Sequence, residues 1–139
     1  NNDARHNTVK LLDIFVGLPS IIFTNDETSV LRRKLYGKAG EFRPTKYGLE
    51  YRVLDNFALR SPETTELVFD LVEHTLEQVD NHNELEILNS IDINNVKKAI
   101  NSSNKKLANS IVKQIQFPKD LIKRIYKNYN HEFYKAWRI

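Results

Sequence analysis

Two Glu-x-Arg tripeptides lie close together in the stretch KAGEFRPTKYGLEYRVLDNF, residues 38–57, and their residue types suit anion and metal chemistry. On a strand, Glu50 and Arg52 would share one face about 7 Å apart, from the strand rise per residue. A carboxylate there can hold a hard divalent cation, and a guanidinium beside it can bind phosphate or carboxylate in bidentate fashion. These groups serve phosphoryl transfer. The alternative is a surface ion pair, which contributes little to stability.

The elements that must position these side chains are predicted to form a β-hairpin. Gly40–Arg43 is expected to be extended, residues 44–48 to form the connection, and Leu49–Asp55 to form the second strand. Side chains alternate across a strand, so Glu50, Arg52 and Leu54 share one face. The other face carries Leu49, Tyr51 and Val53 and is expected to meet the core, with the Tyr51 hydroxyl hydrogen-bonded.

Helices are predicted on both sides of the hairpin. One covers Asn7–Val16 and is ended by Gly17 and Pro19, with a buried run at Ser20–Phe23 after it. A second starts near Thr24 and passes through Arg32, Arg33 and Leu35. A longer helix begins at Ser61-Pro62-Glu63 and ends near Asp80. Apolar positions in 93–100, 107–115 and 121–129 indicate two or three shorter helices, so the predicted class is α+β.

The composition sets outer limits on the function. The chain of 139 residues has no Cys, which excludes disulfides, thiolate metal sites and a cysteine nucleophile. No apolar run approaches the roughly 20 residues that cross a bilayer, and no signal peptide is visible. Met is also absent, so we expect that Asn1 is not the natural start of the polypeptide.

Charge is unevenly distributed along the chain. Residues 61–92 carry nine acids and no Lys or Arg, whereas residues 93–139 carry eleven bases and two acids. We interpret this as an acidic helix beside a basic C-terminal region. The alternative is an anion-binding surface for nucleic acid or nucleotide.

Residues 33–57, RKLYGKAGEFRPTKYGLEYRVLDNF, resemble the phage-type carboxylate–amine ligases, also called amidoligases. That family shows an Arg, then Tyr-Gly-x-Ala-Gly-x-Phe-Arg, then Tyr-Gly-x-Glu-Tyr-Arg-x-Leu followed by Asn-Phe. Upstream, LLDIFVGLPSIIF is similar to the family's Leu-Asp helix and Gly-Leu-Pro-Ser turn. The resemblance covers roughly residues 9–72. Ala58 departs from it, because an aromatic residue is expected there.

The resemblance implies an antiparallel sheet like that of glutamine synthetase and glutamate–cysteine ligase, whose concave face binds ATP, Mg2+ and a carboxylate substrate. The implied reaction activates the carboxylate as an acyl phosphate, which an amine then attacks. The expected partners are therefore a carboxylate substrate and an amine acceptor, either a peptide or a small molecule. The variable position Glu41 is expected at the surface. The implied roles are metal ligand for Glu50, catalytic contacts for Arg52 and Arg43, and ATP contacts for Arg33, Tyr36 and Gly40.

The resemblance also implies a division of the chain. Residues 1–80 would be the C-terminal part of an amidoligase catalytic domain, and residues 81–139 a helical extension. The family carries further acidic and histidine motifs upstream, so the missing N-terminal half is expected as a separate chain or as a preceding segment. The expected location is the host cytoplasm, with the virion as the alternative.

Two further function classes stay open. The chain could be a structural or binding module, including a virion component, that keeps the ligase fold without the chemistry. It could also bind nucleic acid through its basic, tyrosine-rich C-terminal region.

Overall fold

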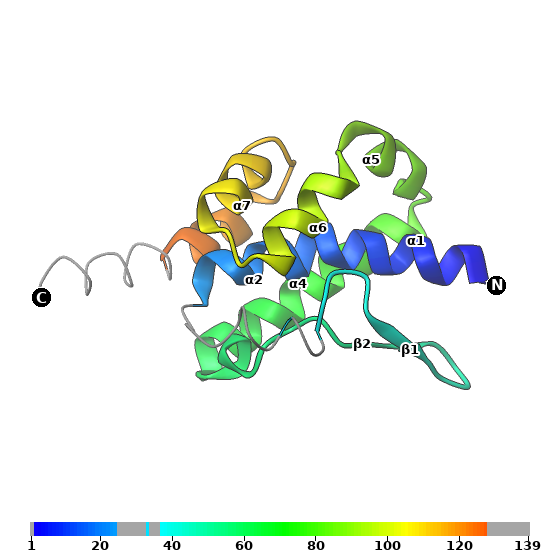
Figure 1. The fold of residues 1–139 in the computed structure, drawn as a ribbon, viewed down its shortest axis with the longest axis horizontal. Coiled ribbons are helices and arrows are strands. Elements are labelled where there is room, and N and C mark those ends of the chain that lie inside the picture. The colour runs from blue at the N-terminus through cyan, green and yellow to red at the C-terminus, as the bar shows by residue number, and fades with distance from the viewer. Residues whose placement is uncertain (1, 25–32, 34–36, 128–139) are drawn as a thin grey trace, which may run out of the picture.

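A single long helix with one irregular turn forms the centre of the molecule (Figure 1). The computed structural model describes residues 2–24, 33 and 37–127. Helix α1 (Asn2–Leu12) continues through a π-helical turn, η1 (Asp13–Gly17), into α2 (Leu18–Phe23). Backbone angles remain helical at both junctions, with φ −62° at Leu12 and at Leu18. Every side chain of η1 and α2 is buried, which makes this segment the inner part of the core.

The predicted end of this helix at Gly17 and Pro19 is wrong, because the helix continues to Phe23. Gly17 has ordinary helical angles, φ −60° and ψ −49°. In a regular α-helix the Pro19 ring would clash with the carbonyl four residues earlier. The π turn widens the helix just before it, since the Leu18 N–H bonds to the Asp13 carbonyl five residues back. Pro19 then occupies the first turn of α2, where an N–H donor is not needed.

The hairpin forms as predicted, but it is shorter. Strands β1 (Phe42–Pro44) and β2 (Leu49–Tyr51) pair antiparallel, and Arg43 lies opposite Glu50. The Thr45 N–H closes the turn on the Gly48 carbonyl at 3.0 Å. The second strand does not extend to Asp55, because it has no pairing partner there. β1 begins only at Phe42, after the turn at Gly40, and the last backbone bond between the two segments joins Arg52 to Glu41. The alternation of faces is confirmed up to Val53, which is buried, whereas Glu50 and Arg52 are exposed. Leu54 was predicted on the face of Glu50 but packs against the core, because it lies past the end of β2.

The helices after the hairpin begin with η2 (Asn56–Leu59) and α4 (Pro62–Asp80). The predicted start of α4 is confirmed, with Ser61 and Thr64 forming a reciprocal capping box. The short helices predicted later are observed as α6 (Ile93–Asn101), α7 (Lys105–Val112) and the helical residues 119–127. Helix α5 (Glu84–Ser90) was not predicted, because its seven residues are too few to show a recognisable apolar period.

The later helices pack around the central one. α4 and α6 both contact η1, and α7 contacts α2. Figure 1 shows α6 and α7 on one side of the central helix and the hairpin on the other. One hydrophobic core joins residues from all of these helices, including Leu18, Leu71 and Ile100. The predicted domain boundary at residue 80 stays a prediction.

The fold class is α+β, as predicted, with one two-stranded antiparallel sheet among the described residues. The short helix predicted from Thr24 through Leu35 lies outside the described residues, apart from Thr24 and Arg33. Arg33 is helical. Within the described part of the chain, no helix has the length and apolar character needed to span a membrane.

Candidate functional site

The outer face of the hairpin gathers three of the predicted site residues. Arg43 and Glu50 stand directly opposite each other in the ladder, and the Arg43 guanidinium donates to the Glu50 carboxylate. Their side chains are 64% and 44% exposed. Arg52 is also exposed. It lies one residue past the end of β2, but its N–H bonds to the Glu41 carbonyl at 3.0 Å, so the pairing continues and strand alternation assigns Arg52 to the face of Glu50. The structure therefore brings two cations and one carboxylate together on an open surface.

This contact is the surface ion pair that the sequence offered as the alternative to a functional site. It forms across the two strands, between Glu50 and Arg43. Exposed ion pairs of this kind typically contribute only about 0–1 kcal/mol. Either member can therefore exchange its partner for a ligand at little cost.

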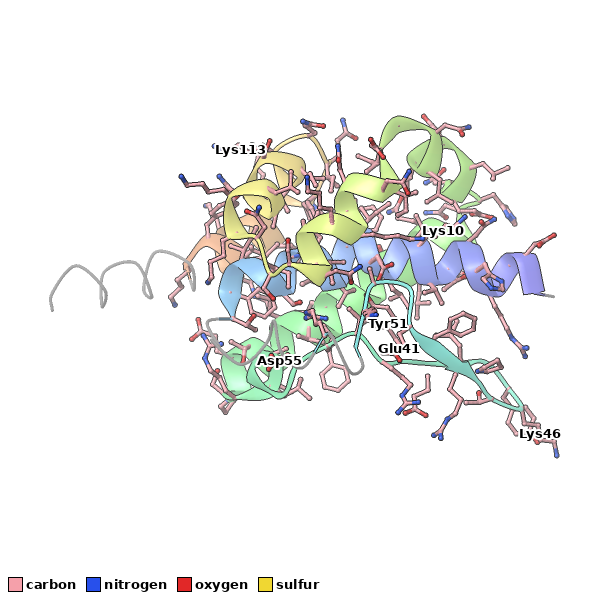
Figure 2. All side chains as sticks on the ribbon, viewed as in Figure 1. Lys10, Glu41, Lys46, Tyr51, Asp55 and Lys113 are labelled. Carbon is pink, nitrogen blue, oxygen red and sulfur yellow. The ribbon has the colours of Figure 1, made fainter. Side chains whose placement is uncertain are left out.

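The inner face of the hairpin is fixed to the central helix by Tyr51. Its hydroxyl donates to Asp13 Oδ1 at 2.6 Å. This confirms the expectation of a hydrogen-bonded Tyr51 at the edge of the core. Figure 2 shows Tyr51 on the helix side of the hairpin, while Lys46 lies at the tip, away from the helices. Tyr51 thus connects the strand that carries Glu50 to the irregular turn of the helix.

Asp13 is a fully buried acid. Burial raises the pKa of its carboxyl from 3.8 to about 6, and the rise is limited by the Tyr51 hydrogen bond, the Gly40 backbone and the positive charges of Lys97 and Arg33. The pKa of Tyr51 is raised in turn, first by burial and then by the negative charge of Asp13. The two groups form one electrostatically coupled pair.

Two glycines allow the hairpin to approach the helix. A Cβ on Gly17 would lie 2.5 Å from Tyr51 Oη, a distance that real Cβ atoms do not reach. A larger residue at position 17 would therefore push the tyrosine away. Gly40 has φ +81°, a conformation that L side chains rarely adopt, and its backbone faces Asp13. Gly40 is thus a turn residue beside the Asp13 carboxylate. Its predicted contact with ATP stays a prediction.

Arg33 and Glu41 hold the loop before the hairpin. Arg33 is buried, and its guanidinium donates to the Gly37 carbonyl and, at 3.0 Å, to the Val53 carbonyl. Its role as an anion contact stays a prediction. The expectation that Glu41 lies at the surface is wrong: it is half-buried, because its carboxylate accepts the Gly37 N–H.

Further contacts anchor both ends of the hairpin. At the tip, the Arg5 guanidinium donates to the Thr45 carbonyl at 3.3 Å. At the base, the Ala39 N–H donates to Asn101 Oδ1 at 2.7 Å. Between them, the His6 and Phe42 rings meet edge to face, with centroids 5.4 Å apart. The hairpin is therefore held at several points along its length.

Sequence reasoning missed Asp13 as part of the site, although a signal was present. Asp13 is the one charged residue in the apolar run LLDIFVGLPSIIF, residues 11–23. A charged residue in such a run is either paired or costly. Tyr36, predicted to contact ATP, lies outside the described residues.

The described part of the chain holds no preformed metal centre. Among the described residues, no group of three or more His, Asp or Glu side chains is placed to hold a metal ion. If Glu50 binds Mg2+, it would be one ligand among several. Phosphate oxygens and water would supply the others, as is common for Mg2+ in phosphoryl-transfer sites. A cavity of about 560 Å³ lies elsewhere, between α4, α5 and residues 114–118, and no predicted site residue lines it.

An α+β protein with an exposed Arg–Glu–Arg face on a short hairpin has groups suited to anionic substrates. The family described as phage phiEco32-like COOH.NH2 ligase-type 2 matches residues 3–138. The chain belongs to this family, and the resemblance read from its hairpin is confirmed. No curated protein matches the chain. No solved structure matches it either.

Proposed function

We propose that this chain contributes the phosphate- and metal-binding face of an ATP-dependent carboxylate–amine ligase. Family membership indicates a carboxylate–amine ligase. The observation that supports the finer proposal is the grouping of Arg43, Glu50 and Arg52 on one exposed hairpin face. An antiparallel sheet like that of glutamine synthetase, completed by a preceding segment or a partner chain, is part of the same proposal.

The proposed reaction has two steps. A substrate carboxylate oxygen attacks the terminal phosphorus of ATP, the bond from that phosphorus to ADP breaks, and an acyl phosphate forms. The amine nitrogen then attacks the carbonyl carbon, phosphate leaves with the bonding electrons, and the nitrogen loses a proton. The products are an amide, ADP and phosphate.

The hairpin residues suit the electrostatic needs of these steps. Negative charge gathers on the transferring phosphoryl group, and fixed cations stabilise it. Arg43 and Arg52 are the candidates for this role, because both guanidiniums are exposed on the same face. The Glu50 carboxylate would hold Mg2+, which supplies further positive charge to the phosphate oxygens when it is bound. The expected place of action is the host cytoplasm, where ATP is available.

The first test is ATP binding with and without Mg2+, measured by isothermal titration calorimetry. Binding is a better first readout than turnover, because it can be measured without knowing the carboxylate and amine substrates. We expect Mg2+-dependent binding that Glu50→Gln weakens at least about tenfold, or about 1.4 kcal/mol. Glu66→Gln is the matched control, because Glu66 is also exposed but lies on α4.

Two results would contradict the proposal. The first is the absence of Mg2+-dependent ATP binding by the wild-type chain. The second is DNA binding that weakens steeply with salt and ignores Glu50→Gln, which would favour a nucleic-acid-binding protein. Unchanged affinity in the Glu50→Gln variant, with ATP still bound, would remove Glu50 from the site.

A further inference from the structure

We propose that Asp13 is a positioning residue for the ligase site, and that it acts through Tyr51 to fix the strand that carries Glu50 and Arg52. This inference rests on the proposed function. Asp13 does not face the outer surface of the hairpin and is not assigned any contact with substrate. Its task is to hold the inner face, so that the outer face keeps one orientation.

The geometry connects Asp13 directly to the charged face. Tyr51 lies between Glu50 and Arg52 in sequence and points to the opposite side of the strand. Tyr51 is the last residue of β2, and fixing its side chain opposes rotation of the strand about its axis, which orients the neighbouring Glu50 and Arg52. β2 has three residues in a two-stranded sheet, which is marginal on its own. Its orientation therefore depends on contacts such as the 2.6 Å bond from Tyr51 to Asp13.

A buried carboxylate such as that of Asp13 is an energetically unfavourable acceptor for a hydrogen bond that serves stability alone. The Asp13 side chain is fully buried, and Oδ2 has no hydrogen-bond partner at bonding distance among the described residues, although the Gly40 backbone and the charges of Lys97 and Arg33 partly stabilise the carboxylate. Burying the charge is still unfavourable, and an amide or hydroxyl would accept the Tyr51 proton at lower cost. What the carboxylate adds is a short, charge-assisted bond with a single polarity, because an ionised acid cannot donate.

Two features of the helix backbone accommodate the same bond. The central helix departs from α geometry at Asp13–Gly17, and π-helical turns are often found at functional sites. Within this turn, Gly17 leaves open the space that the Tyr51 hydroxyl occupies. Helix interiors disfavour Gly, so its presence here is explained by this contact. The irregular turn, the glycine and the acid all accommodate the same tyrosine hydroxyl.

The test compares Asp13→Ala, which removes the acceptor, and Tyr51→Phe, which removes the donor, with the wild-type chain in two measurements. The first is amide hydrogen exchange in the hairpin, at the Arg52 and Thr45 N–H groups. The second is the affinity for ATP with Mg2+. Ile125→Val is the matched control, because it removes one methylene from the buried core among residues 119–127, away from the hairpin. Two variants are used because one of them could fold poorly, and the test stands on either.

We expect both variants to raise hairpin exchange and to weaken ATP affinity about tenfold, while Ile125→Val leaves the affinity unchanged. The double variant Asp13→Ala/Tyr51→Phe should bind ATP no more weakly than the weaker single variant, because both changes break the same bond. Wild-type affinity in folded Asp13→Ala and Tyr51→Phe would overturn the positioning role. A wild-type chain that does not bind ATP would overturn the proposed function and, with it, the assignment of Asp13 to a ligase site.

Discussion

Replacing Gly17 by Ala sets two physical effects against each other. The backbone at Gly17 has helical angles, so Ala fits the conformation. In an ordinary helix interior this change would stabilise the protein by about 1 kcal/mol. At this position the new Cβ would lie 2.5 Å from Tyr51 Oη and 3.2 Å from Ile100 Cδ1. The Ile100 methyl can shift by a few tenths of an ångström, but the tyrosine hydroxyl is held by Asp13.

The cost of the clash exceeds the gain in helix propensity. If Tyr51 stays in place, overpacking in the core costs about 1–3 kcal/mol. If Tyr51 moves, its hydrogen bond to a charged acceptor is lost, which costs about 1.5–3 kcal/mol. After subtracting the gain of about 1 kcal/mol, we expect Gly17→Ala to lower the free energy of unfolding by up to roughly 2 kcal/mol. For a chain of this size, the melting temperature should fall by up to roughly 10 °C.

A second variant isolates the cause. Tyr51→Phe removes the hydroxyl that meets the new Cβ, so Gly17→Ala in the Tyr51→Phe background should be neutral or stabilising. Urea denaturation of the wild type, both single variants and the double variant gives the interaction energy between the two positions. We expect at least about 1.5 kcal/mol, from the same hydrogen-bond and packing costs. A Gly17→Ala variant more stable than the wild type would refute the proposed packing of Tyr51 against the helix.

Three further outcomes are expected. The pKa of Asp13 is raised by burial from 3.8 to about 6, so the unfolded chain releases this proton at lower pH than the folded one. Its contribution to the free energy of unfolding therefore falls by about 3 kcal/mol as pH rises from about 4 to 6. Denaturation at pH 4–7 should show this fall in the wild type but not in Asp13→Asn, and equal slopes would contradict it. Arg33→Met should lower the free energy of unfolding by at least about 2 kcal/mol, because buried carbonyls of Gly37 and Val53 lose a donor. A loss within experimental error in urea denaturation would show that these bonds are dispensable. Arg43→Gln should change stability by less than about 1 kcal/mol, because its ion pair is exposed, yet weaken ATP affinity about tenfold in titration calorimetry. Unchanged affinity would exclude Arg43 from phosphate binding.

The sequence predicted correctly those elements that a single local signal determines, such as a helix cap or the alternation of side chains along a strand. Ser61-Pro62 marked the start of α4, since the cap and the proline both favour a first helical turn. The alternation from Leu49 to Val53 predicted which side chains face the core, but it failed at Leu54, which lies past the end of β2. The helix over residues 2–23 was misread because Gly17 and Pro19 are usually helix breakers. Their effect here depends on a π turn, which is not recognisable from the residue pattern.

The candidate site was predictable only where its geometry is local. Glu50 and Arg52 share a face because of strand geometry, which is local. Arg43 became the partner of Glu50 because the turn sets the register of the two strands, and that register places Pro44 opposite Leu49. The contact between Asp13 and Tyr51 joins positions 38 residues apart. No local pattern predicts such a pair, although a lone acid in an apolar run indicates that a partner must exist.

The orientation of the charged face is therefore a long-range property of the fold. The hairpin contacts Arg5 at its tip, Asp13 at its centre and Asn101 at its base, and these residues belong to α1, η1 and α6. The two outer contacts are exposed hydrogen bonds, which are weak in water, whereas the central one is partly buried and involves a carboxylate. Because η1 packs against α4 and α6, the central contact transfers the rigidity of the core to Glu50 and Arg52. The two-stranded hairpin among the described residues can in this way present a fixed set of charges.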